Sequence, residues 1–426
     1  MSFQKKSKDS RKTIIIGIDG VSDNLVKDLA EKGEMPNLAS LITNGSISKM
    51  HSAIPAVSNV NWSSIVTGKN PGEHGIFGFT ELIKGTYTLS FPDRRRLTKT
   101  PFWKDKKNKK YVILNVPAMY PAEKINGTFV SGFVSPDLKK AVEPSEALDY
   151  LKGIDYNVDV ASEKAHESKE LFMNELFMTL RKREKAYKHF WKQKWDVFMV
   201  VFTGTDRLEH FFIDAHKNED HDYHEKFIEY FKELDRIIGG LIDRIGPDDK
   251  LLMMSDHGME EIKKSVNVNK VLEENGLLNL GNKPENRYKN IQKGTQAFSL
   301  TPGRIYLNRK ERYPHGSIEK REKDDILNKI ISVFDDLKYC GNKVIKEIHK
   351  KEEIYEGKQM DKAPDIVLIP ESGFKLKGGV KYDELFEDEQ ILKGKHTGKD
   401  AFLYCNKDDL PKSPTVEDVR YLINES

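Results

Sequence analysis

Long apolar runs, cysteine and an excess of charge of one sign are all scarce in this sequence. No run reaches the roughly 20 consecutive apolar residues that a membrane-spanning helix needs, and the mean hydropathy is −0.62, so a membrane span is excluded. The two cysteines, Cys340 and Cys405, exclude a disulfide framework and a thiolate metal cage. The 70 Lys and Arg residues against 67 Asp and Glu residues give a net charge of +3, which speaks against a stable nucleic-acid partner.

The beginning of the sequence also lacks the features of a secretion signal. Residues 1–11 are basic and almost without apolar side chains, which predicts a disordered tail. The apolar run that follows is short and ends at Asp19, so it does not resemble the core of a signal peptide. Together with the low cysteine content, this favours a soluble protein of the reducing cytoplasm.

What the sequence does contain is an alternation of strand and helix patterns. Short β-branched and apolar runs predict buried strands at 13–18, 110–116, 128–133, 196–203 and 250–254. Helical spacing of apolar residues predicts a helix that runs from about residue 22 to Leu38 and Leu41, a helix start at 61–67, and long helices over 162–195 and 224–245. Strands that alternate with helices imply right-handed crossovers, so we expect an α/β fold with a mostly parallel sheet sandwiched by helices.

The same patterns suggest how the 426 residues are divided. Length alone allows two to three domains, or one large sheet with insertions. We expect a core at 12–260, with a helical cover around 140–195, and a return to this core at 386–426. The pattern is looser at 261–385, with a loop at 284–295, strands at 304–307 and 363–370, and a helix at 318–337. We interpret this stretch as a smaller mixed α/β insertion that covers one end of the sheet.

Carboxylates and imidazoles follow three of the predicted strands. Asp19 follows the first strand, Asp206 and His210 follow the strand at 196–203, and Asp256-His257 follows the strand at 250–254. Ligands of an open parallel sheet bind beyond the carboxyl ends of its strands. Crowded carboxylates repel one another and resist burial, and divalent cations relieve both costs. Asp and His ligands suit Zn²⁺, with Mn²⁺ or iron as alternatives.

Each of these residues also has an ordinary alternative role. Asp19 could cap the following helix, and Asp206 with His210, at i and i+4, could form a simple ion pair on one helical face. The adjacent pair Asp256-His257 is more specific, because such a pair at a strand end rarely serves packing.

Five segments stand out when they are taken in order: GIDG at 17–20, SNVNWSSIVTGKNPGEHGI at 58–76, Asp206 to His210, DHGM at 256–259, and GKH at 394–396. Together they resemble the alkaline phosphatase superfamily, in its type I phosphodiesterase/nucleotide pyrophosphatase branch. The resemblance covers about residues 12–80, 195–260 and 390–400. It implies an alkaline phosphatase-like fold and an enzyme that hydrolyses phosphoric esters.

The resemblance also implies a site with two divalent metal ions, Zn²⁺ or else Mn²⁺ or iron. One ion would be held by Asp206, His210 and His396, and the other by Asp19, Asp256, His257 and the oxygen of a nucleophile. His396 enters on the family pattern alone, since by itself it reads as an exposed histidine in a turn. The alignment places the nucleophile at Ser58, with Ser52, Ser63 and Ser64 as nearby alternatives.

The chemistry expected at such a site is attack by Ser58 on phosphorus, a phosphoseryl intermediate, and hydrolysis by water. A serine hydroxyl is a weak nucleophile until a metal lowers its pKa, and two cations about 4 Å apart can bind the attacking and leaving oxygens. We therefore expect a phosphodiesterase or nucleotide pyrophosphatase that acts on a small-molecule phosphoester. Phospho-alcohol head-group transfer, phosphonate hydrolysis and phosphomonoester hydrolysis are the alternatives.

Two departures from the family pattern affect the predicted substrate. Phe79 stands where the pyrophosphatases place an asparagine that binds a phosphoryl oxygen. Asn61, Asn115 or the backbone N–H of Asn59 are the candidates to replace it. The arginine that binds monoesters in alkaline phosphatases proper is absent, so a diester or phosphonate is favoured over a monoester. Sulfatase chemistry is disfavoured because neither cysteine, nor Ser58, has the required sequence around it. The sequence does not favour any oligomeric state.

Overall fold

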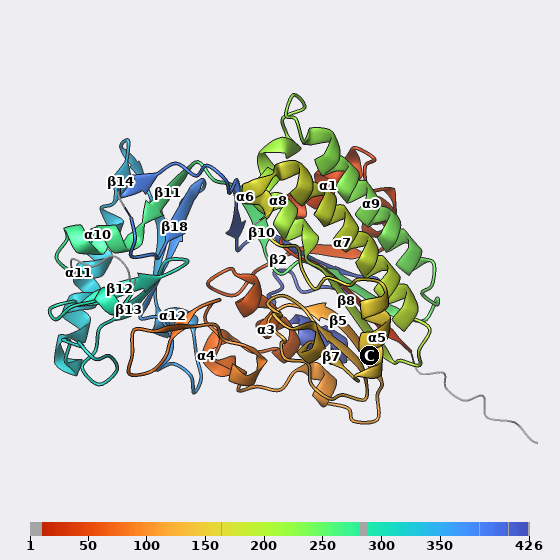
Figure 1. Cartoon of the computed structure of the whole chain (residues 1–426), viewed down its shortest axis with the longest axis horizontal. Helices are drawn as coiled ribbons and strands as arrows, with labels where there is room; N and C mark the ends of the chain where they lie inside the picture. Colours follow the sequence, from red (N-terminus) through yellow and green to blue (C-terminus); the bar gives the residue numbers. More distant parts are fainter. Residues whose placement is uncertain (1–10, 163, 282–287, 383, 408, 425–426) are drawn as a thin grey trace, which may run out of the picture.

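A computed structural model describes residues 11–162, 164–281, 288–382, 384–407 and 409–424. Nearly all of the predicted tail at 1–11, and part of the predicted loop at 284–295, lie outside these residues. Figure 1 shows the core and a second group of elements side by side along the longest axis of the molecule. Among the described residues, no helix is both long enough and apolar enough to cross a membrane.

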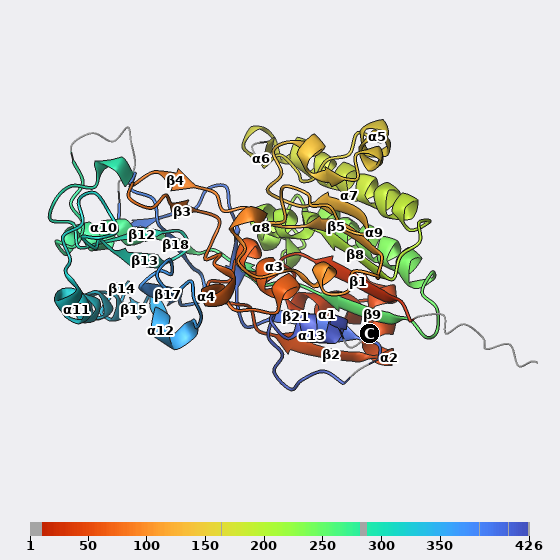
Figure 2. The same ribbon diagram turned by 90° about the horizontal axis from the view of Figure 1, so that it is seen from below.

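The core is built on one eight-stranded sheet with the order β2-β21-β9-β1-β8-β5-β6-β7, and Figure 2 labels the strands from β2 to β5. Strands β9, β1, β8, β5 and β6 run parallel, whereas β2, β21 and β7 are antiparallel to their neighbours. The strands are β1 Thr13–Ile18, β2 Ser46–Met50, β5 Tyr111–Val116, β6 Gly127–Ser131, β7 Val142–Glu143, β8 Val197–Phe202, β9 Lys250–Met254 and β21 Ala401–Cys405. The predicted α/β fold with a mostly parallel sheet is therefore confirmed.

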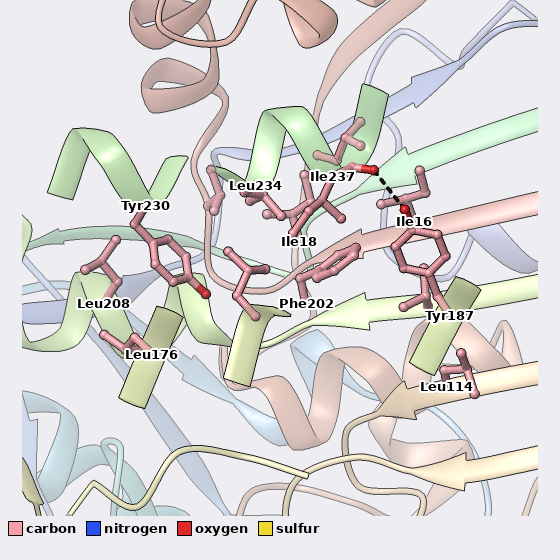
Figure 3. Close-up of a cluster of buried hydrophobic side chains, with 14 of the residues drawn as sticks. Ile16, Ile18, Leu114, Leu176, Tyr187, Phe202, Leu208, Tyr230, Leu234 and Ile237 are labelled. Atoms are coloured by element: carbon pink, nitrogen blue, oxygen red, sulfur yellow. Dashed lines mark hydrogen bonds between the residues drawn. The ribbon is translucent and has the colours of Figure 1, made fainter. Parts of the chain in front are cut away.

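Helices cover both faces of this sheet because its central strands are apolar on both sides. Ile14, Ile16 and Ile18 of β1 join one buried cluster with helices α1, α2, α7, α8 and α9, whereas Ile15 joins another with α3 and α13. Figure 3 shows part of the first cluster, where the hydroxyl of Tyr187 donates to the carbonyl oxygen of Ile237. The core helices are α1 Asp23–Glu31, α2 Pro36–Asn44, α3 Ser58–Thr67, α4 Pro71–His74, α5 Glu146–Gly153, α6 Lys164–Glu167, α7 Lys169–Phe190, α8 Gly204–His216, α9 His224–Ile242 and α13 Val419–Asn424.

Several helices differ from their predicted bounds, among them the first two in the sequence. The helix expected from residue 22 to Leu41 is two helices, because Gly33 has a φ of 74° and Pro36 begins α2. Helix α3 begins at Ser58 rather than at residue 61, so Ser58 occupies the first helical position.

The second group of elements is formed mainly by residues 264–387. Its larger sheet has the order β12-β13-β17-β16, and a three-stranded sheet has the order β18-β11-β19. Its elements are α10 Val268–Glu274, α11 Lys323–Asp335, α12 Lys351–Ile354, β11 Lys264–Asn267, β12 Ala297–Leu300, β13 Arg304–Leu307, β14 Lys338–Tyr339, β15 Asn342–Lys343, β16 Ile345–Lys350, β17 Ile366–Pro370, β18 Phe374–Lys377 and β19 Phe386–Glu387. The division into core and covering insertion remains a prediction.

A hairpin from the N-terminal half of the chain packs against this second group. Strands β3 Glu81–Leu82 and β4 Leu89–Ser90 flank Tyr87, which is buried among residues of β12 and β13. The Tyr87 hydroxyl donates to Asn308 Oδ1 at 2.7 Å, and its ring stacks on Tyr313. This second group of elements thus packs against a segment that lies far from it in the sequence.

Candidate active site

Three of the predicted ligand segments lie at the same edge of the sheet. In the register of the parallel strands, Ile18 of β1 lies beside Phe202 of β8, and Gly17 lies beside Met254 of β9. The residues that follow these strands therefore emerge together. They are Asp19 after β1, Asp206 and His210 in the first two turns of α8, and Asp256-His257 after β9.

His396 reaches the same place through a separate ladder. Strands β10 (Gly258–Glu261) and β20 (Gly394–Thr397) pair antiparallel, with Met259 opposite His396. The imidazole of His396 stacks on that of His257, with ring centroids 3.7 Å apart. No local pattern in the sequence indicates this pairing, because β20 lies far from β10 along the chain.

Ser58, at the start of α3, is buried beside these ligands. Its Oγ lies 3.3 Å from Asp19 Oδ1 and 3.1 Å from His257 Nε2. The single hydroxyl proton can serve one of these acceptors at a time. The three alternative serines bond elsewhere: Ser52 to the carbonyl of Asp256, Ser63 to that of Asn59, and Ser64 to His74.

The three imidazoles all present Nε2 to the centre of the cluster. The Nδ1 atoms of His210, His257 and His396 lie 2.9–3.0 Å from the carbonyl oxygens of Gly394, Gly258 and Ala56, respectively. A carbonyl only accepts, so each Nδ1 carries the proton and each Nε2 has a free lone pair. His210 Nε2 and His396 Nε2 lie 2.9 Å apart, and two lone pairs at that distance repel unless a cation lies between them. Burial also lowers the pKa of His396 to about 3, which keeps that ring neutral.

The carboxylates of Asp19, Asp206 and Asp256 complete the donor set. Burial, and then repulsion from neighbouring carboxylates, raises the pKa values of Asp19 and Asp256 well above their ordinary range. Asp206 Oδ1 and Asp256 Oδ2 are buried without a hydrogen-bond partner among the described residues. Asp206 Oδ1 lies 3.2 Å from His396 Nε2 and 3.4 Å from His210 Nε2. Neutral imidazoles and unpartnered carboxylates fit a divalent cation.

Ligand atoms in the described part of the chain form two groups that could hold metal ions. One group is Asp206, His257 and His396, and the other is Asp19, Asp256 and His257. His257 belongs to both groups, whereas the resemblance assigned it to the second ion alone. The structure brings all six predicted ligands and Ser58 together in one cluster.

Trp62 is a contributor that the sequence reasoning missed. Its indole Nε1 donates to Asp19 Oδ2 at 2.9 Å, so Oδ1 of the same carboxylate turns toward Ser58 and His257. The ring approaches the backbone so closely that a Cβ at Gly17 would meet it at 2.5 Å. A glycine within a β-branched strand is the signal in the sequence that points to this close approach.

The predicted substrate-binding asparagines have hydrogen bonds outside the ligand cluster. Asn61 Oδ1 accepts from the backbone N–H of Ala53 at 2.8 Å. Asn115 is fully buried, accepts from the Tyr156 hydroxyl and donates to the carbonyl oxygen of Val158. The backbone N–H of Asn59 lies in the first turn of α3, where a helix leaves N–H groups without intrahelical acceptors. It is the candidate whose geometry suits a phosphoryl oxygen best.

The chain is similar to a known family and to solved structures. The sequence model of a family described as type I phosphodiesterase/nucleotide pyrophosphatase matches residues 13–399. Phosphonoacetate hydrolase from Sinorhizobium meliloti 1021, solved with phosphonoformate and with phosphonoacetate, superimposes with a TM-score of 0.62 at 16% identity over 97% of this chain and 94% of that chain. Murine ectonucleotide pyrophosphatase/phosphodiesterase 5 gives a TM-score of 0.58 at 13% identity over 97% of this chain and 94% of that chain. At these identities the two structures show a shared fold.

Proposed function

Because the chain belongs to the type I phosphodiesterase/nucleotide pyrophosphatase family and is a hydrolase of phosphoric esters, we propose that it cleaves phosphodiester or pyrophosphate-type bonds of a small molecule with Ser58 as the nucleophile. The observation that carries this proposal is the position of the Ser58 hydroxyl, within 3.3 Å of Asp19 and 3.1 Å of His257. No other serine discussed above bonds to two of the predicted metal ligands.

The donor set supports two divalent cations, for which Zn²⁺ is our proposal and Mn²⁺ or iron the alternative. Asp206, His210 and His396 would hold one ion, and Asp19, Asp256, His257 and Ser58 the other. Bound cations would neutralise the buried carboxylates, make the serine hydroxyl more acidic and offset the negative charge of the phosphoryl group.

Residues of this chain would then carry out the steps of an in-line displacement at phosphorus. Ser58, whose hydroxyl a bound cation would make more acidic, releases its proton to solvent, and its Oγ attacks phosphorus as the bond to the leaving oxygen breaks. The N–H groups of the first turn of α3 face the phosphoryl oxygens, as helix N-termini do for anions. Water then attacks the phosphoseryl group, the P–Oγ bond breaks, and Ser58 recovers its proton.

Replacement of Ser58 tests this role directly. We expect Ser58→Ala to lower kcat with bis-p-nitrophenyl phosphate by several orders of magnitude, while elemental analysis finds the same metal content as in the wild-type protein. Ser63→Ala is a matched control on the same helix, because Ser63 Oγ bonds to the carbonyl oxygen of Asn59. Unchanged turnover in Ser58→Ala would remove Ser58 from its proposed role.

Phosphonate hydrolysis is the second candidate function. It is supported by the likeness to phosphonoacetate hydrolase and by Phe79, which offers no polar group where the pyrophosphatases have an asparagine. Steady-state kinetics on a phosphonate, a phosphodiester and a phosphomonoester would rank these substrates. Added alcohols, with analysis of the products, would reveal transfer of a phospho-alcohol group in place of hydrolysis.

We also propose that the protein works in the cytoplasm, which is a reducing compartment. The support for this location is the low cysteine content, with Cys340 exposed, Cys405 buried and neither in a disulfide.

A further inference from the structure

We propose that Arg207 is a positioning residue, which orients the carboxylate of Asp206 toward the metal site while Asp159 cancels its charge. This inference rests on the proposed function, since it concerns how one of the two cation sites is held. Arg207 follows Asp206 directly in α8, and the sequence assigned it no role.

The guanidinium group of Arg207 is held on three sides. Its Nη1 donates to Asp206 Oδ2 at 3.2 Å, and its Nε and Nη2 donate to Asp159 Oδ2 at 3.1 and 2.8 Å. It lies over the ring of Phe133, 4.3 Å from the centroid. The side chain is 15% exposed, so this is a largely buried arrangement rather than a surface ion pair.

The bond to Arg207 determines which oxygen of Asp206 faces the histidines. Oδ2 is engaged by the guanidinium, and Oδ1 is the oxygen that lies 3.2 Å from His396 Nε2 and 3.4 Å from His210 Nε2. A carboxylate free to rotate could present either oxygen or both. Groups that form a hydrogen bond to a metal ligand on the side away from the metal commonly change metal affinity by 10–100-fold.

A fixed positive charge beside a cation site has an electrostatic cost, which explains the presence of Asp159. A lone guanidinium would repel a divalent cation and compete with it for Asp206. Asp159 is 13% exposed and accepts two of the N–H bonds of Arg207, so the pair is neutral overall. Arg207 can therefore orient Asp206 without lowering the attraction of the site for cations.

Phe133 connects this pair to the region of the nucleophile. It packs edge-to-face against Phe79, with ring centroids 5.7 Å apart. Residue 79 follows Gly78, whose carbonyl oxygen accepts from the side chain of Asn59 in α3. Phe79 thus has a packing role on the residue that holds Arg207, in place of the phosphoryl contact expected from the family pattern.

Metal affinity of three variants tests the inference. Arg207→Met removes the positive charge and Asp159→Asn removes the negative one, so a purely electrostatic role predicts tighter binding in the first and weaker binding in the second. A positioning role predicts that both weaken one of the two bound Zn²⁺ ions by about 10–100-fold and leave the other unchanged. Arg207→Lys keeps the charge but replaces the planar, fork-shaped guanidinium by a compact ammonium that cannot reproduce the same contact geometry, and we expect it to weaken the same ion.

The measurement is competition for Zn²⁺ with a chromophoric chelator, on the full chain, with thermal unfolding of the metal-free protein as the check on folding. Arg236→Met is the matched control, because Arg236 bonds to Glu184 and Glu233 on the helical surface. Equal or tighter binding in Arg207→Met, or in Arg207→Lys where the Met variant does not fold, would overturn the inference and leave the proposed function standing. A wild-type protein that binds no divalent ion would overturn both.

Discussion

At the scale of single residues, the site depends on buried hydrogen-bonding groups that orient each ligand. The carbonyl oxygens of Gly394, Gly258 and Ala56 fix the tautomers of the three histidines. The indole N–H of Trp62 orients the carboxylate of Asp19 without adding a charge. These contacts set the direction of each lone pair, and metal affinity follows from that direction.

Trp62→Phe tests the indole contact with little change in shape. Asp19 would lose a buried hydrogen bond, which costs about 1–3 kcal/mol of stability, and we expect metal affinity to fall about tenfold. Trp103→Phe is the matched control, because Trp103 is also buried and donates to Glu123 at 2.7 Å. Urea unfolding and chelator competition on both variants separate the two effects. Equal loss of metal affinity in both would contradict a specific role for Trp62.

His74 gives the protein a pH-dependent stability outside the metal site. Burial lowers the pKa of His74 from 6.5 to about 3, with Nδ1 accepting from the backbone N–H of Ile76 and Nε2 facing Ser64. The unfolded chain takes up a proton near pH 6.5 and the folded protein does not, so stability is lost as pH falls below 6.5. Between pH 7.5 and pH 5 this loss is about 2 kcal/mol.

Urea unfolding of the wild-type protein and of His74→Gln at both pH values measures this contribution. We expect the free energy of unfolding of the variant to change by about 2 kcal/mol less than that of the wild-type protein over this interval. Parallel changes in the two proteins would show that folding does not lower the pKa of His74.

At the scale of elements, the strands were predicted more closely than the helices. Strands β1, β9 and β13 have the bounds expected from the sequence, because short β-branched or apolar runs between polar residues leave little freedom. The helical pattern at 22–41 continued across Gly33 and Pro36, and only the structure shows that the chain turns there. The ladder of β10 and β20 could not be predicted, because residues far apart in the sequence form it.

The ladder of β10 and β20 determines the position of His396. It contains one ion pair whose two charges can be exchanged by mutation. Lys395 lies opposite Glu260, with Nζ 2.5 Å from Oε1. We expect Lys395→Glu, which places like charges opposite each other, to shift β20 and lower metal affinity about tenfold. The double variant Glu260→Lys with Lys395→Glu should recover most of the loss. Chelator competition on the three proteins provides the readout, and no recovery in the double variant would count against this explanation.

At the scale of the whole molecule, metal binding and stability are coupled. Asp19 and Asp256 have raised pKa values in the metal-free protein, so the stability of that form falls as pH rises through those values. A bound cation removes this cost, and Zn²⁺ at 100 times its Kd adds about 2.7 kcal/mol for each site. We therefore expect the gain in Tm on adding Zn²⁺ to be larger at pH 8 than at pH 6. Scanning calorimetry with and without a chelator measures it, and a gain that shrinks as pH rises would contradict the assignment of these carboxylates.

The sequence predicted the mostly parallel sheet and the candidate metal ligands that meet at its edge. Both predictions follow from where the strands of a parallel sheet end. It did not predict how the insertion is held. Tyr87 and its hairpin carry no pattern that distinguishes them from an ordinary surface loop, and their partners lie more than 200 residues further along the chain.

The hairpin has a practical consequence for any chimera built from this protein. Exchanging residues 261–385 alone for those of a relative would leave Leu82, Tyr87 and Leu89 without the surface that now buries them. The remaining core would expose an aromatic ring and two leucines to water, which favours self-association. A graft meant to change substrate preference therefore has to carry the segment 81–90 together with its distant counterpart.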